Sequence, residues 1–89
     1  MKVKVLYFAS LREQLGCGSE DIELPPDSVT LGALRAHLIA RGGHWQSALA
    51  EGRPVRMAVN QDMVARTQTQ QVAIKAGDEI AFFPPVTGG

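Results

Sequence analysis

Near its end the chain reads Gly77-Asp78-Glu79-Ile80-Ala81-Phe82-Phe83-Pro84-Pro85, and this stretch decides the fold. Gly77 and Asp78 predict a turn, and the β-branched and aromatic residues after them predict a strand over 79–83. The two prolines end this strand, because neither can donate a hydrogen bond to a neighbouring strand. Side chains alternate along a strand, so Phe82 and Phe83 point to opposite faces and only one of them can meet a helix. The alternation leaves open which one it is.

Four more strands are predicted upstream of this one. Residues 3–8 are rich in β-branched and aromatic side chains, and both faces become apolar toward residue 8, as in a central strand. A second strand is expected over 20–24, where it ends at a pair of prolines. The third and fourth, over 55–59 and 63–65, flank residues that favour a turn.

The main helix is predicted between the second and third strands. Thr30 or Ser28 is expected to cap its start, Arg41 falls in its last turn, and Gly42 and Gly43 end it. Its apolar residues recur at helical spacing and predict one buried stripe, formed by Leu31, Leu34, Leu38 and Ile39.

Two short helical segments are predicted beside the main helix. Ser10 followed by Glu13 is a capping-box pattern, in which each side chain satisfies a free backbone N–H, and Gly16 supplies the stop. Trp45 and Leu49 predict another short segment, with Trp45 placed in the core.

The predicted order, β-β-α-β-β-β, indicates an α+β roll, in which a mixed sheet of about five strands packs on one main helix. The β-grasp fold is the best-known arrangement with this order. We expect one β-grasp domain over residues 1–83 and a flexible tail over residues 84–89, because the tail has nothing left to pack against.

Size and charge narrow the possible classes of function. The chain has 89 residues, of which 45% are hydrophobic, and nine basic residues balance nine acidic ones. Nucleic-acid-binding surfaces are usually basic, so no nucleic-acid partner is expected.

No apolar run approaches the roughly 20 residues that span a bilayer, and the first residues do not form a signal peptide. We therefore expect no membrane partner, and a cytoplasmic location that the single cysteine also fits. Two histidines without a matching cysteine pair predict no metal site.

Three segments, VLYFASLRE over 5–13, AVNQ over 58–61 and DEIAFFPPVTGG over 78–89, span most of the chain. In this order they resemble the small, sulfur-carrying subunit of molybdopterin synthase, a family of ubiquitin-like proteins. The resemblance implies that an ATP-dependent adenylyltransferase, similar to ubiquitin-activating enzymes, adenylates the terminal carboxylate. Sulfur then replaces the adenylate and leaves a thiocarboxylate. The large subunit of the synthase would use this sulfur to build molybdopterin from a cyclic pyranopterin precursor.

The resemblance also implies which residues act. Gly89 carries the reacting carboxylate, and an exposed apolar patch on the open face of the sheet, formed by Phe8, Met63 and Phe83, binds the partner. The tail contributes Pro84, Pro85, Val86, Thr87 and Gly88 to the same contact. The residues are physically compatible with this scheme. Glycines fit a narrow channel, and the six residues of the tail, 84–89, extend at most about 20 Å. The chain would bind no cofactor itself and would act without catalytic side chains of its own, in an assembly of two small and two large subunits.

Other functions are open at this stage. The same fold could carry sulfur for thiamine, cysteine or tRNA thiolation, although the double proline favours the molybdopterin pathway. The chain could instead be a protein modifier that forms isopeptide bonds with lysines, or an interaction module with an idle tail. Cys17 has no neighbouring group in the sequence that would activate a thiol, so we interpret it as incidental.

Overall fold

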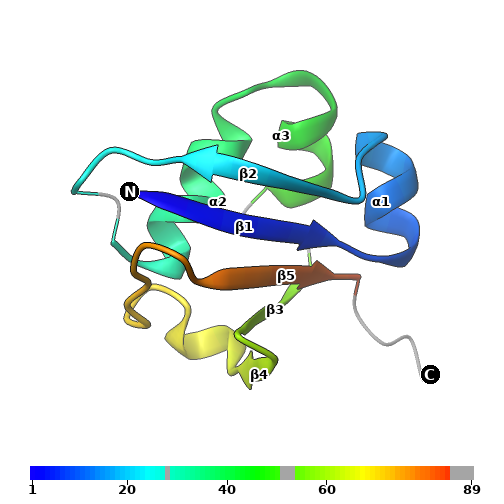
Figure 1. The fold of residues 1–89 in the computed structure, drawn as a ribbon. Coiled ribbons are helices and arrows are strands. Elements are labelled where there is room, and N and C mark those ends of the chain that lie inside the picture. Colours follow the sequence, from blue (N-terminus) through cyan, green and yellow to red (C-terminus); the bar gives the residue numbers. More distant parts are fainter. Residues whose placement is uncertain (28, 51–53, 85–89) are drawn as a thin grey trace.

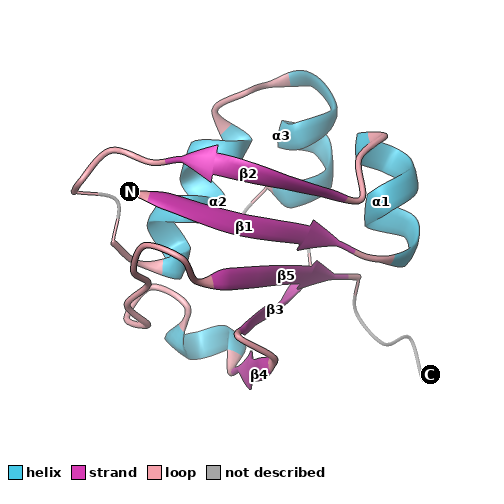
Figure 2. Ribbon diagram, viewed as in Figure 1, coloured by secondary structure: helices cyan, strands magenta, loops and turns pink. Residues whose placement is uncertain are grey.

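The computed structural model describes residues 1–27, 29–50 and 54–84, and it confirms the predicted order of elements (Figures 1 and 2). The strand predicted over 79–83 has these bounds in the structure. The elements are β1 (Lys2–Tyr7), α1 (Ala9–Leu15), β2 (Ser19–Glu23), α2 (Leu31–Ile39), α3 (Gly43–Leu49), β3 (Arg56–Val59), β4 (Asp62–Val64), the 3-10 turn η1 (Arg66–Gln68) and β5 (Glu79–Phe83).

The five strands form one mixed sheet in the order β2-β1-β5-β3-β4. The first and last strands pair in parallel at its centre, and the other pairs are antiparallel. The helices α2 and α3 lie on one side of the sheet, as Figure 1 shows. This is the α+β arrangement of the β-grasp fold, as the element order predicted. It leaves the other side of the sheet without a covering helix among the described residues.

The main helix, α2, follows its predicted pattern. Thr30 caps it, since its side-chain oxygen accepts a hydrogen bond from the backbone N–H of Ala33 at 3.1 Å. The three leucines of the predicted stripe are fully buried, while Ile39 packs at the edge of the core. Burial of each such side chain contributes about 1.5–3 kcal/mol, so the stripe is what holds the helix on the sheet.

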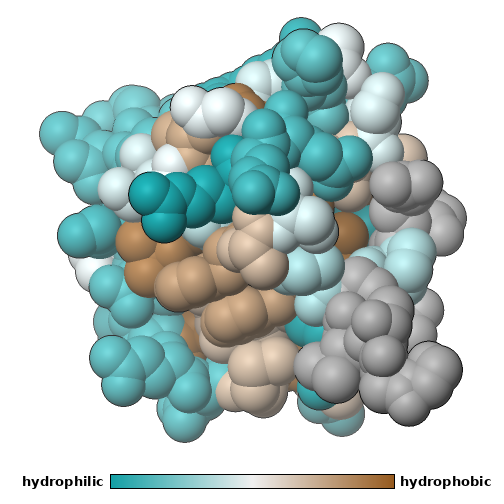
Figure 3. Space-filling model, turned by 90° about the vertical axis from the view of Figure 1, so that its right-hand side faces the viewer, coloured by the Kyte–Doolittle hydropathy of each residue, from teal (hydrophilic) through white to brown (hydrophobic). Residues whose placement is uncertain are grey.

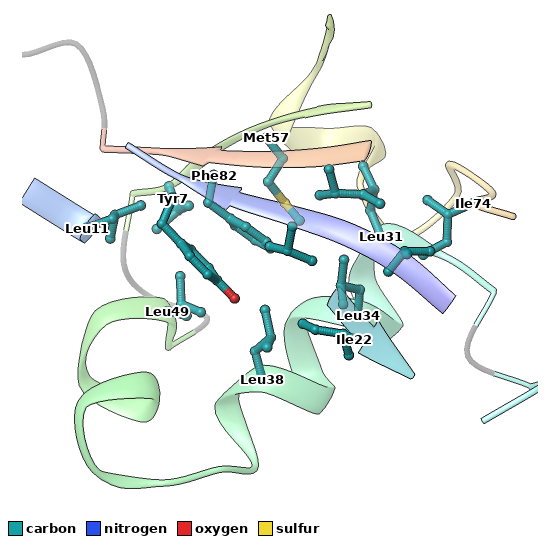
Figure 4. Packing of buried hydrophobic residues seen from close by; sticks show 14 of the residues in the cluster. Tyr7, Leu11, Ile22, Leu31, Leu34, Leu38, Leu49, Met57, Ile74 and Phe82 are labelled. Carbon is teal, nitrogen blue, oxygen red and sulfur yellow. The ribbon is translucent and has the colours of Figure 1, made fainter. Parts of the chain in front are cut away.

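The core lies between α2 and the covered face of the sheet (Figure 4). Tyr7 from β1 stacks on Phe82 from β5, with ring centroids 5.8 Å apart. Trp45 of α3 meets Tyr7 edge-on at 5.4 Å and is partly buried, so it packs at the margin of the core rather than at its centre. Aromatic pairs of this kind add about 0.5–1.5 kcal/mol beyond the area they bury.

The start of α1 differs from the prediction. Phe8 is its N-cap and no side chain caps it, so the capping-box role predicted for Ser10 is wrong. The backbone N–H of Phe8 donates to Phe82 at 3.1 Å, which continues the parallel pairing of β1 and β5. The chain therefore leaves the sheet at this residue, and Ser10 lies within the first turn of the helix. Gly16 ends α1 with a positive φ of 67°, as predicted.

The end of α2 also comes earlier than the sequence predicted. The helix ends at Ile39, and Arg41 lies beyond it in the turn toward α3. Gly42 is the N-cap of α3 and Gly43 its first residue, so the glycine pair separates two consecutive helices. The segment after β4 includes the short turn η1.

Candidate docking face and C-terminal stem

The open face of the sheet exposes apolar side chains where β1 and β5 end. Phe82 is fully buried on the helix side, and its neighbour Phe83 therefore points to the open face, where it is half-buried. Phe83 stacks on Phe8, with ring centroids 4.8 Å apart and ring planes 7° from parallel. Phe8 itself is 41% exposed. The two rings form one apolar cluster from residues that are 75 positions apart in the sequence.

A shallow hollow of about 310 Å³ extends from this pair across the sheet. Ala58 and Ala81, which lie opposite each other on β3 and β5, form its floor, because their small side chains leave the sheet uncovered. Met63 lies opposite Ala58 on β4 and is 52% exposed. The lining consists of Leu6, Phe8, Ala58, Gln61, Met63, Glu79, Ala81 and Phe83. We call these eight residues the docking face.

The three residues predicted for the exposed patch, Phe8, Met63 and Phe83, thus lie on one surface. Exposed apolar side chains scattered singly are ordinary on a monomer, but a contiguous patch is typical of a protein-binding site. A band of hydrophobic surface is visible on the side of the molecule where β1 and β5 end (Figure 3). A hollow of this size accommodates one or two apolar side chains of a partner.

Polar contacts at the start of β5 fix the register on which the docking face depends. The Asp78 carboxylate is buried and accepts hydrogen bonds from the Asn60 side chain at 3.1 Å and the Lys75 backbone N–H at 2.8 Å. The Asn60 side-chain oxygen accepts in turn from the backbone N–H of Glu79 at 3.0 Å. These bonds join the end of β3 to the start of β5 and so hold Ala58 opposite Ala81. The turn chemistry of residues 60 and 78 was visible in the sequence, but their mutual contact was not.

The tail leaves the sheet at Pro84, directly after Phe83. Pro84 is half-buried and lines a second hollow of about 260 Å³, together with residues of α1, α3 and the segment before β3. The other predicted tail residues, Pro85, Val86, Thr87, Gly88 and Gly89, lie outside the described residues. The position at which the tail leaves the sheet is nevertheless defined, because the backbone N–H of Phe8 donates a hydrogen bond to the carbonyl of Phe82. The stem therefore starts beside the docking face.

A separate polar cluster lies at the helix side of the sheet edge. Arg41 forms two hydrogen bonds to the Glu20 carboxylate, at 2.9 and 3.0 Å, and the Tyr7 hydroxyl donates to the same carboxylate at 2.9 Å. The Arg41 guanidinium also lies 4.5 Å above the ring centre of Trp45. The cluster connects β1 and β2 to the turn between α2 and α3. Sequence reasoning missed it, since the residues come from four separate segments.

The cluster shifts the pKa values of its members. Burial opposes ionisation of Glu20, but the hydrogen bonds from Arg41 and Tyr7 together outweigh it and lower the pKa of the carboxyl. Burial, and then the hydrogen bond to Glu20, raises the pKa of Tyr7 above its ordinary value. The hydrogen bond to Glu20 raises the pKa of Arg41. The ionised Glu20 carboxylate is therefore part of the folded structure.

The remaining candidates for chemistry have ordinary surroundings. The half-buried Cys17 thiol donates to the carbonyl of Ser19 at 3.2 Å. Within residues 1–27, 29–50 and 54–84, no three His, Cys, Asp or Glu side chains gather as metal ligands. Over the same ranges, no helix has the length and apolar composition required to cross a membrane.

A sequence profile of the ThiS family matches residues 5–89. The chain belongs to the ThiS family. Among relatives, it is 44% identical to the molybdopterin synthase sulfur carrier subunit of Haemophilus influenzae, covering 98% of this chain and 99% of the relative. The corresponding subunit of Escherichia coli is 42% identical over the same shares of the two chains. The predicted resemblance to this family is therefore confirmed over nearly the whole chain.

The fold is also found in a solved structure from Helicobacter pylori, a complex of subunits 1 and 2 of the molybdopterin-converting factor. One chain of it superimposes on the present structure with a TM-score of 0.67 and 26% identity, and each chain is covered completely. The ubiquitin-like β-grasp fold predicted from the sequence is thus confirmed.

Proposed function

We propose that this ThiS-family chain is the sulfur carrier subunit of a molybdopterin synthase, and that it docks on the large subunit through the docking face. The observation that carries the proposal is the stacked pair of Phe8 and Phe83. In this pair Phe8 is exposed and Phe83 is half-buried, and both lie beside the strand end from which the tail leaves. Relatives that match from end to end bear this name, and the Helicobacter pylori complex supports a large-subunit partner.

The docking face and the tail have different roles in this proposal. The docking face contributes apolar area, and burial of apolar area is the main source of affinity between proteins. The tail that starts at Pro84 contributes the reactive group. Because the stem begins next to the docked surface, binding of the domain holds the tail near the partner's active site. The effective concentration of the tail at that site then far exceeds that of the free carrier.

In the proposed reaction, the Gly89 carboxylate attacks the α-phosphorus of ATP on an adenylyltransferase and releases pyrophosphate. A sulfur nucleophile then attacks the acyl carbon, AMP leaves, and the terminal thiocarboxylate remains. On the large subunit, the thiocarboxylate sulfur forms a bond to the cyclic pyranopterin precursor, and water then cleaves the bond between that sulfur and the Gly89 acyl carbon, which restores the carboxylate. Two carriers would serve a large-subunit dimer, so that each molybdopterin receives two sulfur atoms. We place this reaction in the cytoplasm.

Intact-mass spectrometry of the chain tests the first step. After incubation with an adenylyltransferase of this class, ATP and a sulfur donor, we expect the mass to rise by the exchange of one oxygen for sulfur. Deletion of Gly89 should abolish this shift and leave the urea denaturation curve nearly unchanged, since the residue lies beyond β5. An unloaded wild-type chain would contradict the proposal. A large loss of stability on deletion would show that the tail is part of the fold.

The second step separates molybdopterin synthesis from the other thiolation pathways. The loaded chain is mixed with the large subunit of the same organism and the cyclic precursor, and molybdopterin is detected by the fluorescence of its oxidised form. We expect the product only with loaded carrier. A carrier that loads but yields no product would belong to another pathway, and transfer to lysines in place of sulfur loading would identify a protein modifier.

A further inference from the structure

We propose that Arg56 is the charged anchor of the docking face, and that its guanidinium binds a carboxylate of the large subunit when the two proteins dock. The inference rests on the proposed function and names a specificity-determining contact within it. It concerns a residue of β3 that the apolar patch does not include.

The position of Arg56 places it on the open side of the sheet. Arg56 lies directly opposite Phe83 in the antiparallel pair of β3 and β5. Because side chains alternate along a strand and its neighbour Met57 is buried in the core, Arg56 shares the open face with Ala58. The guanidinium therefore lies at the end of the docking face from which the tail departs.

The bonding of Arg56 differs from that of two other arginines in the protein. The Arg35 Nε donates to the carbonyl of Leu49 at 2.7 Å, and Arg41 binds the Glu20 carboxylate. The Nε of Arg56 is shielded from solvent and has no hydrogen-bond partner among the described residues. A buried donor without a partner is costly to the fold. The two Nη groups are not buried in this way and form no hydrogen bond among the described residues, so they are the donors that an acceptor from a partner can reach.

No carboxylate of the described open face is placed to provide that acceptor. Glu79 is the carboxylate that lines the docking face, but it lies at the other end of β5, four residues from Phe83, and is paired in register with Lys4. Four residues along a strand extend about 13 Å along the backbone, and no ion pair joins Glu79 to Arg56 within the described part of the chain. The tail end of the face therefore combines two aromatic rings with a positive charge that has no ion-pair partner in residues 1–27, 29–50 and 54–84.

These features select a carboxylate as the complementary group. A guanidinium presents a planar set of donors that fits the two oxygens of Asp or Glu. When Phe8 and Phe83 are covered, water is excluded from the adjacent arginine, which strengthens a charged contact and penalises an unpaired one. An acidic side chain of the partner at this position would fix the orientation of the bound carrier. The contact lies beside the stem that has to enter the partner's active site. A partner without this acidic side chain would leave a buried charge.

Isothermal titration of the full-length chain with the large subunit of the same organism tests this inference. We expect Arg56→Leu to weaken binding about tenfold or more, mainly through faster dissociation, as loss of one member of a desolvated pair does. Arg56→Lys should recover only part of the affinity, because it keeps the charge and loses the planar fork. Lys4→Leu is the matched control: it removes a positive charge from the opposite end of the same face and should change affinity little.

A double-mutant cycle then identifies the partner group. Each Asp and Glu on the contact surface of the large subunit is replaced by its amide and combined with Arg56→Leu. One of them should show coupling to Arg56 of at least about fivefold, and none should couple to Lys4. The urea midpoint of Arg56→Leu should equal or exceed that of the wild type, because the substitution removes an unsatisfied donor.

Three results would overturn the inference. If Arg56→Leu binds as tightly as the wild type while Phe83→Ala does not, the docking face stands and the charged anchor fails. If neither substitution weakens binding, the proposed docking face fails as well. The Gly89 carboxylate of the chain itself is the competing acceptor. An increase of its pKa in free Arg56→Leu, followed by carbon-13 NMR, would assign Arg56 to the tail and reject the proposal.

Discussion

Phe82 and Phe83 are consecutive residues of one strand with the same side chain, but the two side chains lie on opposite faces of the sheet. Phe82 is fully buried and stacks on Tyr7 in the core. Phe83 points to the opposite side and stacks on Phe8, which is itself exposed. The covered face of the sheet supplies stability, and the open face is the surface that we propose for the partner. A domain this small has one thin core, so helices cover one face and leave the other available.

The largest effect on stability is expected from Phe82→Ala. Removal of a fully buried aromatic side chain costs about 3–5 kcal/mol, a large share of the stability of a domain of this size. Urea denaturation followed by circular dichroism measures the loss. Should the alanine variant fail to fold, Phe82→Leu should still lower the free energy of unfolding, by a smaller amount. A cost below about 1 kcal/mol for the alanine variant would break the assignment of this face to stability.

The neighbouring change, Phe83→Ala, should act on binding. We expect the affinity for the large subunit to fall by about 2 kcal/mol, or about thirtyfold, because aromatic side chains at the centre of an interface dominate its energy. The free energy of unfolding should change by less than about 1 kcal/mol. Val29→Ala is the matched control, since Val29 is an exposed apolar residue outside the docking face. Equal losses of affinity for both variants would remove the distinction between the two faces.

A smaller effect is expected from Glu20→Gln at the edge of the covered face. The substitution keeps the shape of the side chain and removes its charge, so the contact with Arg41 weakens and stability at neutral pH falls by about 1 kcal/mol. Binding to the large subunit should not change. Such a result would support the distinction between the covered and open faces of the sheet. The polar cluster on the helix side would then affect stability and leave binding unchanged.

The pH dependence of this variant has a definite sign. The folded-state pKa of Glu20 lies below its ordinary value of 4.5, so its charge stabilises the fold above that pH. The contribution is lost as the pH falls through the lower folded-state pKa. The difference between the wild type and Glu20→Gln, measured by urea denaturation, should therefore be present at neutral pH and vanish in acid. A difference that persists when the carboxyl is protonated would show that charge is not its cause.

Local signals in the sequence predicted the elements well. The turn at Gly77, the strand over 79–83 and the cap at Thr30 each depend on residues within a few positions of one another. Where a local signal failed, a distant contact was the reason. The Ser10 capping pattern is present in the sequence, but the backbone bond from Phe8 to the Phe82 carbonyl fixes where the chain leaves the sheet, and the helix begins at Ala9 instead.

The features of the candidate site were likewise predictable from the sequence only where they depend on nearby residues. The strand alternation showed that Phe82 and Phe83 point to opposite faces, and the resemblance proposed Phe8 and Met63 as companions of Phe83. The sequence did not show Arg56 opposite Phe83, because the pairing of β3 with β5 joins segments that are more than 20 residues apart. The Glu20 cluster was hidden for the same reason, since its members meet only when the turn after α2 packs on the sheet edge.

By itself, then, the amino-acid sequence determined the element order, the stop signals and the existence of two chemically different faces on the last strand. These features come from backbone preferences and side-chain alternation, which act over a few residues. The tertiary structure alone decided which face the helices cover, which apolar residues gather beside the stem, and that an arginine whose Nε has no acceptor among the described residues lies next to them. Those outcomes depend on strand register and helix packing, and both are set by contacts between parts of the chain that are distant in sequence.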